Sequence, residues 1–262
     1  MRRIKSKIYE WISSMLNHNM EERRSKLTSG TPKKSLPLTD WKKAFPMLSR
    51  YSSNMLLMKQ GPIVIGLYFQ KVYDDYRPIF ISYPLWKDSL KDCMQFYIFH
   101  HEFRNNKNLQ LNVPILNHQS KLLKYQSNFT EAVKCVQSQS SNLLQENVYV
   151  KDIFNYLDYL REHDLLIKLQ RFDGKRELLV YSMMIALYTN NEDLLQWVCN
   201  KTKKQIQTWD KEYFKQCYGY DLETWEAELY QLIDQREEIM ERIRINSMDK
   251  RIAKLKESHL II

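Results

Sequence analysis

Apolar residues recur three or four positions apart at the start of the chain, with basic side chains between them. This spacing predicts an amphipathic helix over residues 4–16. Its apolar positions are Ile4, Ile8, Trp11, Ile12, Met15 and Leu16. The stretch TSGTPKKSLP, residues 28–37, is rich in turn formers and is typical of a linker. We therefore expect residues 1–37 to form a basic amphipathic helix and a linker in front of the body.

Two apolar runs with β-branched and aromatic residues follow. Residues 62–72, PIVIGLYFQKV, are almost continuously apolar, and residues 78–85, PIFISYPL, alternate. With YDDYR between them, the two runs predict an antiparallel β-hairpin. Pro78 and Pro84 lack backbone donors, which favours an edge position or irregular ends for the second strand. Residues 94–103 fit a strand or a helix, and the pattern leaves that choice open.

After Pro114 the chain has no further proline, and Gly174 and Gly219 are its only glycines. This composition predicts helices, at about 117–138, 150–163, 176–189, 191–206 and 221–257. As a single helix, the last segment would run about 50 Å, longer than a domain of this size can cover. We therefore expect its charged second half, with Ile239 and Ile243, to project or to pair with another chain.

The patterns together predict an α+β protein that is mainly α. A small antiparallel β-hairpin or sheet unit in the N-terminal half would precede an α-helical C-terminal body with a long terminal helix. The expected parts are the basic helix and linker (1–37), a small α+β unit (38–116) and the helical body (117–262). A hydrophobic content of 44% and an aromatic content of 13% argue against disorder.

The net charge of +9 is concentrated near the N-terminus. Residues 1–60 contain 13 Lys and Arg against 4 Asp and Glu, and the remainder of the chain is balanced. A localised basic segment can contact phosphates, anionic lipid or an acidic protein. The simpler alternative is a solvated basic tail.

Several chemistries leave no trace in the sequence. It has no GxGxxG, no GxxxxGK[ST] and no GxSxG motif, and no apolar run of the roughly 18 residues that cross a membrane. The four cysteines form no CxxC pair, which signals neither zinc nor a disulfide framework. They are Cys93, Cys135, Cys199 and Cys217. We expect a cytoplasmic protein with reduced thiols, without a cofactor, a metal site or catalytic residues.

The densest titratable cluster is His100, His101 and Glu102. Adjacent histidines on a strand point to opposite faces, so that His100 and Glu102 would share one face. This pair is the basis for a metal-dependent hydrolase or nuclease as one hypothesis. Neither the i, i+2 nor the i, i+4 pairing of two histidines is present. Exposed or hydrogen-bonded histidines at the end of an aromatic element are the alternative.

Residues 150–182 have the order of a winged-helix segment, with a helix, a strand, an Asp-Gly turn and a second strand. In that interpretation one set of side chains faces the DNA groove and another contacts phosphate from the wing. The first set is Lys151, Asn155, Tyr156 and Tyr159, and the second is Arg171, Lys175 and Arg176. The segment carries six basic and six acidic residues, whereas DNA-binding surfaces are usually strongly basic. The alternative is helix from the start of RELLVYS, which abolishes the wing.

The two terminal helices are the features least explained by core formation. The sequence therefore predicts a non-catalytic cytoplasmic interaction or adaptor protein rather than an enzyme, with a protein as its macromolecular partner. The predicted contact residues are Arg2, Arg3, Lys5, Lys7, Trp11, Ile239 and Ile243. Nucleic-acid binding through residues 1–60 and the winged-helix-like segment is the second hypothesis, and peripheral membrane contact is a weaker one. The metal-dependent hydrolase is the third.

Overall fold

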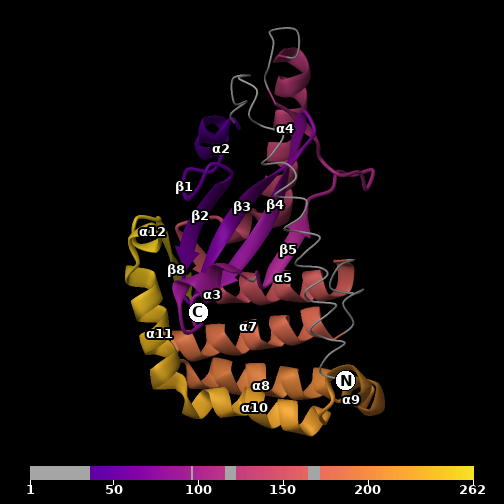
Figure 1. Ribbon diagram of the computed structural model, residues 1–262, viewed down its shortest axis with the longest axis vertical. Coiled ribbons are helices and arrows are strands. Elements are labelled where there is room, and N and C mark those ends of the chain that lie inside the picture. Colours follow the sequence, from indigo (N-terminus) through magenta and orange to yellow (C-terminus); the bar gives the residue numbers. More distant parts are fainter. Residues whose placement is uncertain (1–35, 96, 116–121, 165–171) are drawn as a thin grey trace, which may run out of the picture. The chain divides into compact units, whose positions relative to one another are not determined.

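The computed structural model describes residues 36–95, 97–115, 122–164 and 172–262 (Figure 1). Residues 36–262 cluster as one compact unit. The expected N-terminal helix lies outside the described residues, and so does Arg171. None of the helices in these ranges is long and apolar enough to cross a membrane.

The described residues contain eight strands that form one mixed sheet. The strands are β1 (Ser49–Arg50), β2 (Met55–Gln60), β3 (Ile63–Val72), β4 (Asp75–Pro84), β5 (Phe99–Glu102), β6 (Val113–Pro114), β7 (Asn147–Tyr149) and β8 (Glu257–Ile261). They are ordered β5-β4-β3-β2-β8-β7, with β1 also beside β2 and β6 also beside β4. The predicted hairpin is present as β3 and β4. The sheet is larger than that hairpin and is mixed, because β8 runs parallel to both β2 and β7.

Helices make up most of the remaining described structure, so the expected α+β class with mainly helical content is confirmed. They are α2 (Leu38–Ala44), α3 (Leu90–Gln95), α4 (Leu122–Ser140), α5 (Val150–His163), α7 (Asp173–Thr189), α8 (Glu192–Ile206), α9 (Lys211–Tyr218), α10 (Leu222–Asp234), α11 (Arg236–Met248) and α12 (Lys250–Ala253), with the 3-10 turn η2 (Ser141–Leu143). In Figure 1, α5, α7, α8 and α10 lie in successive rows below the sheet, and α11 crosses their ends.

The segment 94–103, which the sequence pattern left open, contains both elements. Helix α3 ends at Gln95 and strand β5 begins at Phe99. The aromatic rings of Phe80 on β4 and Phe99 on β5 both lie about 5.5 Å from the ring of Tyr156 on α5. This packing of α5 against the end of the sheet positions the site described below.

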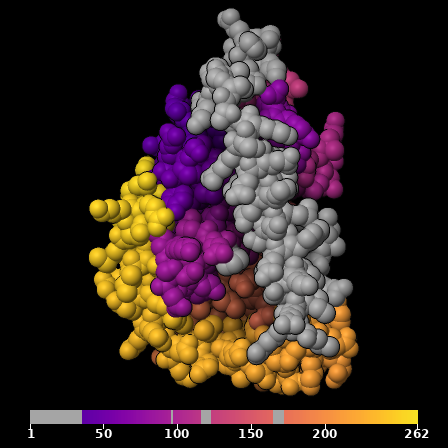
Figure 2. Space-filling view, in the orientation of Figure 1, coloured from indigo at the N-terminus to yellow at the C-terminus, as the bar shows by residue number. Residues whose placement is uncertain are grey.

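The expectation of one long terminal helix is wrong. The helical segment is broken at Gln235 and again at Asp249, and it continues into β8. Polar residues at two positions tie α11 to the body: Arg236 Nε donates to the carbonyl of Leu187 (2.9 Å), and the buried Asn246 Nδ2 donates to that of Leu85 (2.9 Å). Figure 2 shows residues 236–262 as one flank of the surface, without a projecting arm.

Ile239 and Ile243 are therefore core residues, with 0% and 4% of their surface exposed. The idea that they contact another chain is wrong, because the other side chains of this protein already cover them. Ile239 lies beside side chains of the same chain: together with Trp225 and Leu229 it lines a small cavity between α7, α10 and α11.

Replacing Ile239 and Ile243 by Ser should destabilise the fold severely, since each removes a buried side chain at a cost of about 2–5 kcal/mol. Ile245→Ser is the matched control on the same helix, because Ile245 is 55% exposed. Urea denaturation monitored by circular dichroism measures both. A double variant as stable as the control would show that α11 does not pack as described.

Gly66 lies in the middle of the sheet, opposite Leu57 on one side and Ile81 on the other. Its φ is +157°, and a Cβ added there would approach the backbone oxygen of Leu56 to 2.2 Å. We expect Gly66→Ala to cost at least about 3 kcal/mol. Gly219→Ala, at φ +77° with open space around it, should cost only about 1 kcal/mol. Equal losses in denaturant titrations would contradict the backbone contact at Gly66.

Candidate functional site

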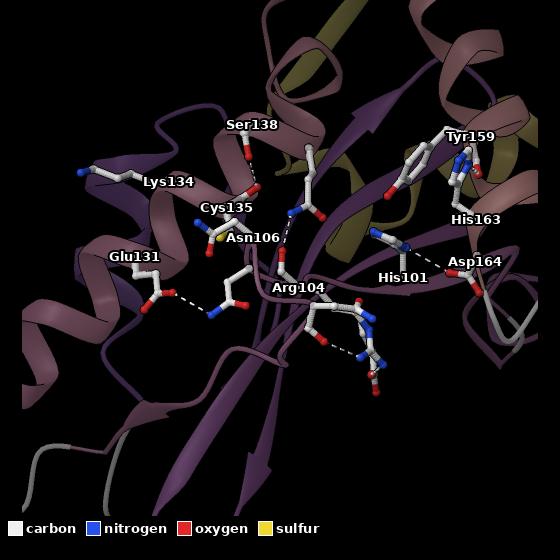
Figure 3. A pocket seen from close by; sticks show the side chains of 14 residues that line it. His101, Arg104, Asn106, Glu131, Lys134, Cys135, Ser138, Tyr159, His163 and Asp164 are labelled. Atoms are coloured by element: carbon white, nitrogen blue, oxygen red, sulfur yellow. Dashed lines mark hydrogen bonds and ion pairs between the residues drawn. The ribbon is translucent and has the colours of Figure 1, made fainter.

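A cavity of about 1060 Å³ lies between β5, the segment after it, α4 and the end of α5 (Figure 3). Polar and charged side chains make up most of its lining. They are His101, Glu102, Arg104, Asn105, Asn106, Asn108, Glu131, Lys134, Cys135, Ser138, Gln139, Tyr159, His163 and Asp164. We call this cavity the His101 pocket.

The alternation of β5 places His101 in this pocket. His101 pairs with Phe80 across the β4–β5 ladder, and its ring lies edge-on to that of Tyr156 on α5, at 6.1 Å. His100, one residue earlier, lies on the other face of the strand, beside the ring of Tyr97. Opposite faces for the two histidines were expected, but the buried member of the pair is His101.

His101 is held by Asp164, the residue directly after α5. The His101 Nδ1 to Asp164 Oδ2 distance is 3.0 Å, and the side chains are only 9% and 7% exposed. A carboxylate can only accept a hydrogen bond, so the proton of this contact belongs to Nδ1. A neutral His101 then presents the lone pair of Nε2 as an acceptor.

The Nε2 atom of His101 is buried and has no hydrogen-bond partner among the described residues. In Figure 3 this edge of the ring points away from Asp164, into the space between Tyr159 and α4. A buried polar atom without a partner costs about 1–3 kcal/mol, so it calls for an explanation such as a ligand or an ordered water.

Aromatic rings form the wall of the pocket on the α5 side. The rings of Tyr159 and His163 stack at 4.8 Å with an interplanar angle of 11°, and the ring of Tyr159 lies 5.9 Å from that of His101. Tyr159 is 40% exposed. This end of the pocket therefore offers π-surface next to the unpaired nitrogen.

The opposite wall is fixed by hydrogen bonds between α4 and the segment after β5. Gln139 Nε2 donates to the carbonyl of Arg104 (2.8 Å), and Asn105 Nδ2 donates to Glu131 Oε1 (3.0 Å). The Oδ1 atom of Asn105 also accepts from the backbone of Lys107 and Leu109, which shapes the turn. The pocket is thus largely pre-formed.

Cys135 is the thiol in this wall. Desolvation, aided by the carboxylate of Glu131, raises the pKa of Cys135 above its ordinary value. A raised pKa keeps the group as a thiol at neutral pH, and the thiol is a weak nucleophile. The pocket therefore lacks an activated cysteine.

The structure does not assemble the metal site considered from the sequence. In the ranges that it describes, no three His, Cys, Asp or Glu side chains are placed to hold a metal ion. Glu102, the expected partner of His100, instead accepts a hydrogen bond from Gln110 Nε2. His118, the next histidine along the chain, lies outside the described residues.

The winged-helix prediction is wrong in its second strand. RELLVYS is helical and belongs to α7, because its apolar residues pack on several sides of a central helix. Arg176 does not face solvent as a phosphate contact: its guanidinium lies 4.4 Å from the ring centre of Tyr218 and donates to the hydroxyl of Tyr220. Lys175 lies in the first turn of α7.

The remaining residues of that hypothesis lie on α5. Lys151 and Asn155 are exposed, Tyr156 is buried against the sheet, and Tyr159 lines the His101 pocket. The four residues that the winged-helix interpretation placed on one DNA-facing surface therefore do not share one surface.

Asp164 is the functional candidate that sequence reasoning missed. It lies 63 residues from His101, and no motif links the two positions. The only local signal is its place directly after an amphipathic helix. No protein-family model, curated protein or solved structure matches this chain, so the functional argument rests on the pocket itself.

Burial lowers the pKa of His100 below 6.5, with the carboxylates of Glu102 and Asp164 opposing that effect. Between the lowered pKa and 6.5 the unfolded chain binds the proton better, so folding stability falls as the pH falls through this window. We expect His100→Gln to lose less stability than the wild type between pH 7 and pH 5 in urea titrations. His259→Gln, at an exposed position on β8, is the control. Parallel pH curves for His100→Gln and wild type would contradict the prediction.

Proposed function

We propose that this protein binds a small polar ligand in the His101 pocket, with the His101–Asp164 pair as its recognition element. The observation that carries the proposal is the buried Nε2 of His101, which lacks a partner among the described residues. Asp164 fixes the ring so that this acceptor is directed into a cavity of about 1060 Å³, just above the range typical of ligand sites.

Binding is favoured over catalysis by what surrounds His101. A histidine–aspartate pair that activates a nucleophile needs a hydroxyl or thiol within hydrogen-bond distance of Nε2. Among the residues described, no side chain fills that position. The raised pKa of the Cys135 thiol also argues against a cysteine nucleophile.

A pocket-filling variant tests the proposal without touching the buried pair. Ser138→Trp should block the cavity from the exposed surface of α4, while Gln137→Trp, its exposed neighbour outside the lining, should not. We expect polar fragments that raise the melting temperature of the wild type to do so for Gln137→Trp but not for Ser138→Trp. A thermal-shift screen followed by calorimetry measures this. Hits that are unaffected by Ser138→Trp, or an absence of hits, would contradict the proposal.

An interaction role for the basic N-terminal segment is a second proposal. Residues 1–35 contain 9 Lys and Arg against 3 Asp and Glu, whereas the rest of the chain is close to balanced. Such a segment suits an anionic partner, whether an acidic protein, a nucleic acid or a membrane surface. The proposal now excludes Ile239 and Ile243, which are buried. A cytoplasmic location, expected from the unpaired cysteines, is part of the same proposal.

Deleting residues 1–30 should leave the melting temperature within a few degrees of the full chain, because residues 36–262 cluster as a separate compact unit. Retention on an immobilised polyanion such as heparin at low salt should be lost. A large drop in melting temperature would show that the segment belongs to the core, and unchanged retention would place the anion-binding surface elsewhere.

A further inference from the structure

The His101 pocket constrains the chemistry of its ligand in three ways: through the hydrogen-bond character of His101, the aromatic wall and the balance of charges. Each constraint comes from contacts within the described residues. The inference that follows rests on the binding function proposed above and narrows it to one class of molecule.

The first constraint is that the ligand must donate a hydrogen bond. Asp164 accepts the Nδ1–H of His101, so Nε2 is an acceptor in the neutral form of the ring. A ligand with only acceptors at this point would leave Nε2 unpaired, whereas a ring N–H would satisfy it. The carbonyl of a ligand could not replace such a donor.

The second constraint is that the ligand must be planar. The rings of Tyr159 and His163 are stacked in nearly parallel planes beside the acceptor, and Tyr159 lies edge-on to His101 at 79°. Aromatic walls favour a planar π-system through face or edge contacts. Asn106 and Asn108 line the pocket too, and their amides can pair with the carbonyl and N–H groups on the edge of a heterocycle.

The third constraint is charge. The lining holds two cationic side chains and three carboxylates, and it includes no surplus of positive charge. All three carboxylates have partners: Glu102 with Gln110, Glu131 with Asn105, and Asp164 with His101. A phosphate would face these carboxylates without a matching set of cations, so the pocket favours a neutral ligand.

We propose that the His101 pocket binds a neutral, planar nitrogen heterocycle through a ring N–H donated to His101 Nε2, as a free nucleobase or nucleoside would do. The heterocycle lies against Tyr159, and the asparagine amides contact its polar edge. The volume of the pocket leaves room for a nucleoside together with ordered water.

Matched pairs of ligands test the N–H donor directly. Isothermal titration of the full chain with uracil and 1,3-dimethyluracil, and with xanthine and caffeine, compares rings that differ in N-methylation. We expect at least one unmethylated ring to bind, and its methylated counterpart to bind about tenfold more weakly, which corresponds to the loss of one hydrogen bond. In His101→Gln the preference for the unmethylated ring should shrink, while His259→Gln should keep it.

Two further ligands test whether the pocket prefers a neutral ligand, and whether it binds a free nucleoside or a nucleic-acid strand. Uridine monophosphate should bind no more tightly than uridine, and the affinity of uridine should change little with salt. A strand of five uridines should bind no more tightly than uridine; tighter binding with a steep salt dependence would overturn the assignment to a free base or nucleoside.

The outcomes separate this inference from the function on which it rests. Equal binding of methylated and unmethylated rings, or no binding of either pair, would overturn the heterocycle assignment. If fragments of another class still bind and Ser138→Trp blocks them, the pocket remains a ligand site with a different specificity. If His101→Gln fails to fold, the Ser138→Trp and Gln137→Trp pair gives the same decision: loss of uracil or xanthine binding in the first variant alone supports the assignment, and equal binding in both overturns it.

Discussion

The parallel pairing of β8 with β2 joins the two ends of the described chain. Lys59 pairs with Glu257 and Gln60 with Ser258, and the backbone N–H of Lys59 donates to the carbonyl of Lys256 at 2.8 Å. An ion pair of 2.8 Å between Lys59 and Glu257 adds to the same contact. The helices that separate β2 from β8 must therefore return to the sheet. This requirement explains why α11 crosses the ends of α7 and α8 instead of projecting (Figure 1).

The same sheet sets up the His101 pocket at its other end. β5 lies at the edge opposite β7, and α5 covers it through the ring of Tyr156. One turn after Leu160, the end of α5 brings Asp164 to His101. Tertiary packing therefore brings the pair together. Both side chains are polar, yet both residues are over 90% buried. Burying an imidazole and a carboxylate costs desolvation energy, which the hydrogen bond between His101 and Asp164 offsets.

The spacing of apolar residues predicted those elements whose buried positions can be recognised from their own segment of sequence. The β3–β4 hairpin and helices α5 and α8 lie close to their expected positions, and α7 starts three residues earlier. The strands β7 and β8 were missed because each is short and they pair with each other across more than a hundred residues. The strand β2 was missed as well, although it pairs with the neighbouring β3. The break at Gln235 was missed as well. Arg236 and Asn246 bond α11 to the carbonyls of Leu187 and Leu85, and no pattern within the helix reveals these distant partners.

Of the two residues of the His101–Asp164 pair, the sequence pointed only to His101. Alternation along a strand separates His100 from His101, and that argument needs no tertiary information. Which of the two is buried depends on α5, and the partnership with Asp164 depends on a contact across 63 residues. The expected pairing of His100 with Glu102 was based on the face of β5 opposite His101. The sequence pattern around β5 could not reveal the pocket, because the opposite wall of the pocket comes from α4.

The tautomer of His101 tests the central claim most directly, since it decides whether Nε2 is an acceptor. Nitrogen-15 NMR of protein labelled at histidine reports the protonation of both ring nitrogens, and His101→Gln assigns the signal. Above the pH at which the ring is charged, we predict that His101 carries its proton on Nδ1 and has a bare Nε2, the reverse of the form preferred by free histidine. A proton on Nε2, with Nδ1 bare towards Asp164, would contradict the hydrogen bond on which the site depends.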